Sequence, residues 1–190
     1  FLHQNRFEKE KIEIFKQNLE SIIVEMQDLG FDHGDLSQSN MIIDKEVNIT
    51  IIDPDSMLHS SCAIQRSVEL GHPSLNHPKR NQYDIGPGLH IIPYELIMLV
   101  VDAIYEDPEL MNEKPDPESF FFSDEDLKNP KKSKLFKYLT KILGKKRVLI
   151  IRNALMTSTL QQAIDLIYPN MRSTLEPVQY FNLDEMPKIK

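Results

Sequence analysis

The chain has 190 residues, of which 41% are hydrophobic and 27% are charged, a composition typical of globular proteins rather than of disordered or fibrous ones. Its formal net charge of −7 argues against non-specific binding of nucleic acid or anionic membranes, and no apolar run approaches the roughly 20 residues that cross a bilayer. The single cysteine, Cys62, excludes an internal disulfide framework and a multi-thiolate zinc site, and it favours a reducing, cytoplasmic location.

The first half of the chain predicts one long helix, a small hairpin and a long loop. Between residues 10 and 30, apolar residues recur at helical spacing with charges between them, and Gly30 provides a stop. Two β-branched runs, at 41–43 and 49–52, flank a short polar turn, which predicts a β-hairpin. Residues 54–90 carry prolines and glycines without periodicity, and loops of this length in compact domains are usually functional.

Helical patterns dominate the second half of the chain. The predicted helices cover residues 91–105, 107–110, 133–143 and 148–167. Ser123 and Asp126 have the spacing of a capping box, which predicts a further helix start. We expect a Pro-rich linker at 112–119 and an extended polar tail after residue 170. The predicted fold class is α+β, mostly α-helical, with one small sheet.

Three polar residues near the predicted hairpin have the spacing of a phosphoryl-transfer site. Asn40 follows Asp35 by five residues, and Asp53 comes 13 residues later, at the end of the hairpin. Magnesium prefers oxygen ligands, so an amide and a carboxylate from the two sides of a hairpin can share such an ion. A separate carboxylate can orient an incoming hydroxyl or accept its proton. The alternative is that Asp and Asn only mark a helix–hairpin junction.

The segment His33-Gly34-Asp35-Leu36, followed by Asn40 and then Asp53, resembles the C-terminal lobe of the protein-kinase-like superfamily. The glycine in the second position is most similar to the bacterial kinase-like and aminoglycoside-phosphotransferase-like branch. Residues 69–80 and 92–110 also look like those bacterial domains. The resemblance covers about residues 8–143 and implies a kinase-like C-terminal lobe over 1–145, followed by a C-terminal helix and extended tail over 146–190.

This resemblance implies a role for each residue of the motif. Asp35 would be the catalytic base or hydroxyl-orienting carboxylate, and His33 would brace the loop that carries it. Asn40 and Asp53 would hold the nucleotide through magnesium, with Asp55 as a second metal contact. The implied cofactors are ATP and Mg²⁺, and the implied partners are a nucleotide and a hydroxyl-bearing acceptor of unknown class.

The parts of a kinase N-terminal lobe are missing from the sequence. No Gly-rich phosphate loop and no strand with a nucleotide-binding lysine precede the first long helix. The chain begins at Phe1 with neither an initiator methionine nor a signal pattern, so we expect a longer protein that supplies this lobe.

The predicted function is ATP- and magnesium-dependent phosphoryl transfer to a hydroxyl in that longer protein. The alternative is a catalytically inactive pseudokinase or a nucleotide- or partner-binding scaffold. A third option is a structural interaction domain that uses its basic helix near 128–137 and its tail.

Two features of the predicted loop have more than one interpretation. His72 and His77 are five residues apart, which suits structural or substrate-facing histidines better than a metal site. The pair Lys79 and Arg80 is either a solvated surface or a holder for an anionic substrate.

Overall fold

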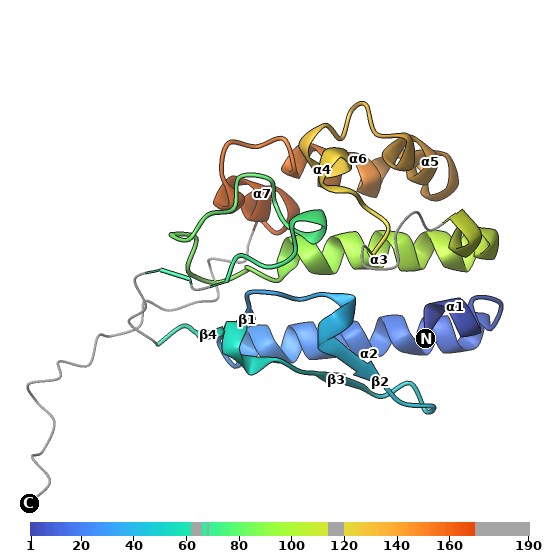
Figure 1. The fold of residues 1–190 in the computed structure, drawn as a ribbon, viewed down its shortest axis with the longest axis horizontal. Helices are drawn as coiled ribbons and strands as arrows, with labels where there is room; N and C mark the ends of the chain where they lie inside the picture. Colours follow the sequence, from blue (N-terminus) through green and yellow to red (C-terminus); the bar gives the residue numbers. More distant parts are fainter. Residues whose placement is uncertain (62–65, 68, 114–119, 170–190) are drawn as a thin grey trace, which may run out of the picture.

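A computed structural model describes residues 1–61, 66–67, 69–113 and 120–169 of the chain (Figure 1). Two long helices, α2 (Lys9–Asp28) and α3 (Ile91–Glu106), lie side by side and contact each other. The short strands pack against α2, and helices from the C-terminal part of the chain pack against α3. The site residues predicted above therefore belong to the α2 side of the molecule.

The long amphipathic helix predicted for residues 10–30 is confirmed as α2, which follows a short helix, α1 (Leu2–Asn5). Its periodic apolar residues form the buried face: Ile12, Phe15, Leu19, Ile23 and Met26. Gly30 ends the helix with φ +73°, and a Cβ there would lie 2.6 Å from Ser60 Oγ. A glycine is therefore required where the chain turns from α2 into the first strand.

The predicted hairpin is also confirmed. It consists of the antiparallel strands β2 (Met41–Ile43) and β3 (Ile49–Ile51), with Met41 opposite Ile51. The Asp44 carboxylate closes the turn by accepting hydrogen bonds from the backbone and side-chain nitrogens of Asn48, each at 2.8 Å. These bonds lower the pKa of Asp44.

A second pair of strands was not predicted. β1 (Phe31–His33) pairs antiparallel with β4 (Met57–His59), with Phe31 opposite His59. Three-residue strands are too short to produce a readable alternation of apolar and polar residues, so the sequence carried no signal for them. The described residues therefore contain two two-stranded sheets rather than one.

Among the described residues of the predicted loop outside β4, the regular elements are two single-turn helices, η2 (Pro54–Ser56) and η3 (Pro73–Leu75). The loop leads into α3, whose Pro93 lies in the first turn, where a missing backbone N–H costs nothing. Thirteen of the sixteen α3 residues are buried. A helix that is apolar on all sides belongs in the interior, and α3 is the central element of the core.

The C-terminal part is helical, as predicted, but one predicted helix is wrong. The elements are η4 (Pro108–Glu113), α4 (Asp124–Lys128), α5 (Lys134–Leu143), α6 (Lys145–Ala154) and α7 (Leu160–Ile167). The capping box of Ser123 and Asp126 and the stop at Gly144 are confirmed. The single helix predicted for 148–167 is instead split into α6 and α7. The break has a local cause, because the Thr159 hydroxyl accepts the Gln162 backbone N–H and starts a new helix.

Helices α6 and α7 contribute to the same core as the rest of the chain. Val148, Ile151 and Ile164 are almost fully buried within it. The domain boundary predicted at 145/146 stays a prediction, and residues 114–119 of the predicted linker and the whole predicted tail lie outside the described residues. Among the described helices, none combines the length and apolarity needed to cross a membrane.

Candidate active site

His33 is completely buried at the end of β1 and joins two parts of the site. Its Nδ1 accepts the backbone N–H of Asp35 at 3.2 Å, and its Nε2 lies 3.1 Å from the carbonyl oxygen of Ile52. Because a backbone N–H can only donate, Nδ1 is the accepting nitrogen, and Nε2 carries the proton and donates it to Ile52. His33 thus connects the loop at Asp35 with the strand end before Asp53.

Asp35 and Asn40 are in direct contact across the loop of residues 35–40. The Asn40 Nδ2 donates to the Asp35 carbonyl oxygen at 2.8 Å and to the Asp35 Oδ2 at 3.0 Å. Both amide hydrogens of Asn40 are used by these bonds, so its Oδ1 is the atom with which it can coordinate a cation. The loop therefore presents a carboxylate and an amide oxygen from neighbouring positions.

Asp53 is brought to the same place by the hairpin. The Ile52 N–H donates to the Asn40 carbonyl oxygen at 3.0 Å, which fixes the chain beside Asn40 just before Asp53. Asp53 itself has φ 64° and ψ 65°, in the left-handed region, where a residue other than glycine stores about 1–3 kcal/mol of strain. Such strain persists only where surrounding bonds enforce it. Here the backbone N–H of Ile52 is bonded to Asn40, and its carbonyl oxygen is bonded to His33. The side chains of Asp53 and Asp55 are exposed.

A further carboxylate, Asp32, anchors the site to the helical part of the molecule. Its Oδ1 accepts the backbone N–H groups of Gly88 at 2.7 Å and Leu89 at 2.9 Å, and the His90 Nδ1 lies 2.8 Å away. Asp32 and His90 are both buried. The residue directly before His33 is thereby tied to the start of α3.

Comparison with known proteins found one similar family. The family model of the RIO domain matches residues 2–64, about a third of the chain. This match shows that residues 2–64 are similar to the RIO domain, which is found in an atypical protein-kinase-like group. At the level of the family, it implies kinase-like, ATP-dependent phosphotransfer. No curated protein and no solved structure matches the chain.

Every predicted site residue lies inside the RIO-domain match: His33, Asp35, Asn40, Asp53 and Asp55. The bonds given above join His33, Asp35 and Asn40 and hold the backbone of Ile52, directly before Asp53, beside Asn40. The side chains of Asp53 and Asp55 are exposed. The roles assigned to these residues remain predictions.

The predicted magnesium ligands are chemically suited to that ion. An amide oxygen from Asn40 and a carboxylate from Asp53 are hard oxygen donors, and both belong to the RIO-domain segment. Among the residues that the structure describes, no group of three or more His, Cys, Asp or Glu side chains could hold a metal ion. Magnesium sites of this kind in proteins usually combine one or two protein oxygen ligands with phosphate oxygens and water.

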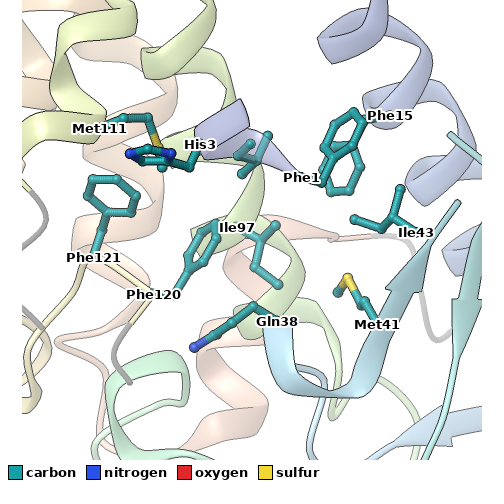
Figure 2. A pocket seen from close by; sticks show the side chains of 11 residues that line it. Phe1, His3, Phe15, Gln38, Met41, Ile43, Ile97, Met111, Phe120 and Phe121 are labelled. Carbon is teal, nitrogen blue, oxygen red and sulfur yellow. The ribbon is translucent and has the colours of Figure 1, made fainter. Parts of the chain in front are cut away.

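A cavity of about 310 Å³ lies beside the RIO-domain hairpin (Figure 2). The Phe1 and Phe15 rings stack at one end with their centroids 5.6 Å apart, and Phe120 and Phe121 lie at the other end. Nine of its eleven lining residues are apolar, and the other two are His3 and Gln38. Phosphate groups require cations or several N–H donors, so the predicted phosphate chemistry does not belong in this cavity.

The structure gives different outcomes for two loop residues with alternative predicted roles, Arg80 and His77. Arg80 does not extend into solvent to hold an anion, because its guanidinium donates to the Gly34 carbonyl oxygen at 2.5 Å and to Asn76 Oδ1 at 2.8 Å. His77 is buried and contacts the Ala154 carbonyl oxygen at 3.2 Å, which confirms its structural interpretation, and burial lowers its pKa.

The sequence pattern around Asp32 and Arg80 indicates neither the anchoring role of Asp32 nor the inward orientation of Arg80. The partners of Asp32 lie 56 and 57 residues later in the chain, and Gly34 is 46 residues away from Arg80. A local sequence pattern carries no information about contacts between residues so far apart in the chain. The glycine at position 34 was the one available signal, since it indicates a place where another group approaches the backbone closely.

Proposed function

We propose that this chain is the C-terminal, catalytic half of a kinase-like phosphotransferase, which transfers a phosphoryl group from Mg-ATP to a hydroxyl acceptor. The observation that carries the proposal is the pair of bonds at Asn40. Its side chain is bonded to Asp35, and its carbonyl oxygen is bonded to the residue before Asp53. The RIO-domain match over the same residues supports this at the level of the family.

In this proposal each residue has a defined task. Asp35 orients the acceptor hydroxyl and accepts its proton as the new phosphate ester bond forms. Asn40 Oδ1 and the Asp53 carboxylate hold magnesium, and Asp55 is a second contact. The ion, when bound, neutralises charge on the β- and γ-phosphates. His33 keeps the two halves of the site in register through its bonds to the Asp35 and Ile52 backbone.

Several finer statements belong to the same proposal. We assign the chain to the bacterial kinase-like, aminoglycoside-phosphotransferase-like branch, with residues 1–145 as the C-terminal lobe and 146–190 as an added helical segment and tail. An N-terminal lobe elsewhere in the protein would supply the rest of the nucleotide site. We also propose a cytoplasmic protein that binds neither nucleic acid nor membranes, consistent with its acidic charge.

The decisive experiment compares wild type with Asp35→Asn in the full-length protein. If Asp35 acts on the acceptor, the variant lowers kcat by roughly 10²- to 10⁴-fold, whereas the affinity for Mg-ATP changes by less than about threefold. Asp28→Asn, at an exposed position at the end of α2, is the matched control and keeps wild-type turnover. A wild-type protein without phosphotransfer, or an unchanged kcat in Asp35→Asn, would contradict the proposal.

The alternative is a pseudokinase or scaffold module, in which the same residues bind a nucleotide or a partner without chemistry. Magnesium-dependent nucleotide binding without turnover in the full-length protein would select this pseudokinase or scaffold function. An intact fold with no binding of Mg-ATP in calorimetry would favour the third option, a structural interaction domain.

A further inference from the structure

The Arg80 side chain joins two segments that are far apart in the sequence. Its Nη1 donates to the Gly34 carbonyl oxygen at 2.5 Å, in the loop that leads to Asp35. The same nitrogen donates to Asn76 Oδ1 at 2.8 Å, and Nη2 lies 3.5 Å from the Glu69 carbonyl oxygen. Asn76 and Glu69 belong to the loop of residues 69–80. Arg80 therefore fixes the 69–80 loop against the backbone beside Asp35.

Glycine at position 34 leaves the space that this guanidinium occupies. A Cβ on Gly34 would lie 2.9 Å from the Ser56 carbonyl oxygen and 3.2 Å from Arg80 Nη2. The first distance is too short for a real Cβ contact, and the second requires the arginine to move. The absence of a side chain at position 34 and the presence of Arg80 are thus two parts of one packing arrangement.

Gly71 packs against the same backbone from the opposite loop. Its φ is +69°, and a Cβ would lie 2.5 Å from Asn76 Nδ2, 2.8 Å from the Gly34 carbonyl oxygen and 3.0 Å from Asp35 Oδ1. Only glycine allows this approach. The close contact brings the next backbone N–H, that of His72, to 2.9 Å from Asp35 Oδ1.

The Asp35 carboxylate is consequently held from two sides. Asn40, within its own loop, donates to Oδ2, and the His72 backbone, from the 69–80 loop, donates to Oδ1. Each carboxylate oxygen has two lone pairs, so each can still accept a further hydrogen bond. Two fixed donors of different origin determine the plane of the carboxylate and thus the direction in which its free lone pairs point.

The charges around Arg80 fit this arrangement. Burial lowers the pKa of Arg80, and the carboxylates of Asp35, Asp84 and Asp32 act in the opposite direction. An arginine remains protonated in such surroundings, and its planar fork can serve acceptors on both loops, which a lysine ammonium cannot do with the same geometry.

We propose that Arg80 is a positioning residue, which holds the Gly71–His72 peptide against residues 34–35 and thereby orients the Asp35 carboxylate for the acceptor. The task of Asp35 rests on the proposed function, whereas the contact itself does not. The exchange rate of the His72 amide hydrogen therefore measures the contact, and phosphoryl transfer measures its consequence.

Hydrogen exchange at His72 tests the contact in the full-length protein, by mass spectrometry on overlapping peptides. Arg80→Met, which removes the fork and its charge, should speed exchange at His72 by about fivefold or more, because the N–H loses its fixed acceptor. Lys79→Met removes an equal charge from the neighbouring exposed position and should leave this exchange within twofold of wild type. Arg80→Lys retains the charge, so its exchange rate at His72 should lie between those of the other two variants. It replaces Arg80→Met in the test if Arg80→Met does not fold.

Unchanged exchange at His72 in a folded Arg80 variant would overturn the proposal, and so would an equal acceleration in Lys79→Met. Where the wild type transfers phosphate, Arg80→Met should lower kcat by about tenfold or more with the KM for Mg-ATP within twofold. Faster exchange with an unchanged kcat would also overturn the proposal, because Asp35 would then not depend on Arg80. If the wild type transfers no phosphate, the proposed function fails, and exchange at His72 alone decides whether Arg80 fixes this contact.

Discussion

The helical body around α3 and the region around the β2–β3 hairpin share one apolar core, but they differ in how closely polar side chains fix the backbone. In the helical body, apolar side chains from α3, α5, α6 and α7 are buried against one another. In the hairpin region, the strands have three residues each, and single polar side chains fix the backbone: His33 to Ile52, Asn40 to Asp35 and Asp32 to the start of α3.

Because of this difference, the helical body mainly contributes stability, whereas the hairpin region mainly sets the geometry of the candidate site. Burial is non-directional and sums over many contacts, so it stabilises the fold without fixing any one atom closely. A hydrogen bond contributes less but sets distance and direction, which is what a site for phosphoryl transfer requires. Substitutions in the helical body should therefore mainly change the free energy of unfolding, whereas substitutions in the hairpin region should mainly change geometry.

The largest loss of stability is expected for Phe122→Ala, in the helical body. The Phe122 ring is fully buried, with its centroid 5.2 Å from that of Phe136, and its removal leaves a cavity. We expect the free energy of unfolding to fall by about 3–5 kcal/mol in urea titration. Phe7→Ala, at a ring that is 61% exposed, is the matched control and should change it by less than about 0.5 kcal/mol. Equal effects of the two variants would show that the burial of Phe122 does not stabilise the helical body.

The next largest loss of stability is expected at Asp32, where the hairpin region meets the helical body. Asp32→Ala removes the acceptor of the Gly88 and Leu89 N–H groups and leaves them buried without a partner. We expect a loss of about 2–4 kcal/mol, measured by the same titration. The exposed Asp28→Ala is the control and should cost less than about 0.5 kcal/mol. A loss below about 1 kcal/mol for Asp32→Ala would mean that this junction is not needed for the fold.

The sequence predicted those parts of the fold and of the candidate site that depend on local spacing. Apolar periodicity predicted α2, the apolar segment at 91–105 predicted α3, and the spacing of Asp35 and Asn40 predicted that both belong to one site. The break between α6 and α7 was missed because the apolar residues on both sides continue one pattern, although the hydroxyl residues from Thr157 to Thr159 were a signal for it.

Contacts between distant segments were beyond sequence analysis for a physical reason. The junction of Asp32 with 88–90 and that of Arg80 with Gly34 each join segments more than 40 residues apart. Nothing in the local pattern specifies which of many charged residues will meet which backbone group. Such pairings follow only from the packing of the complete chain.

A smaller effect is expected at the start of α7. The Thr159 hydroxyl accepts the Gln162 N–H at 3.2 Å, so Thr159→Ala should lower the free energy of unfolding by about 1 kcal/mol. Ser158→Ala removes the neighbouring hydroxyl, which caps no helix in the described structure, and should cost less than about 0.3 kcal/mol. If both variants cost the same, the hydroxyl of Thr159 is not the cause of the break between the helices.

The smallest effect is a dependence of stability on pH through His77. Its Nδ1 accepts the Lys79 backbone N–H at 3.1 Å, and its Nε2 faces the Ala154 carbonyl oxygen. Burial lowers the pKa of His77 below its ordinary value of 6.5, so the unfolded chain binds this proton more readily than the folded chain does. The stability gained from neutral His77 is therefore complete above about pH 6.5 and decreases as the pH falls through and below that value.

His77→Gln removes this titration, so its stability deficit relative to wild type should become smaller as the pH is lowered from 7.5 to 5. Urea titrations at several pH values measure this difference, and His3→Gln, at an exposed position, should run parallel to wild type. A deficit of His77→Gln that stays constant with pH would show that the fold tolerates a protonated imidazole at this place. The contact between the 69–80 loop and α6 would then not depend on the neutral form of His77.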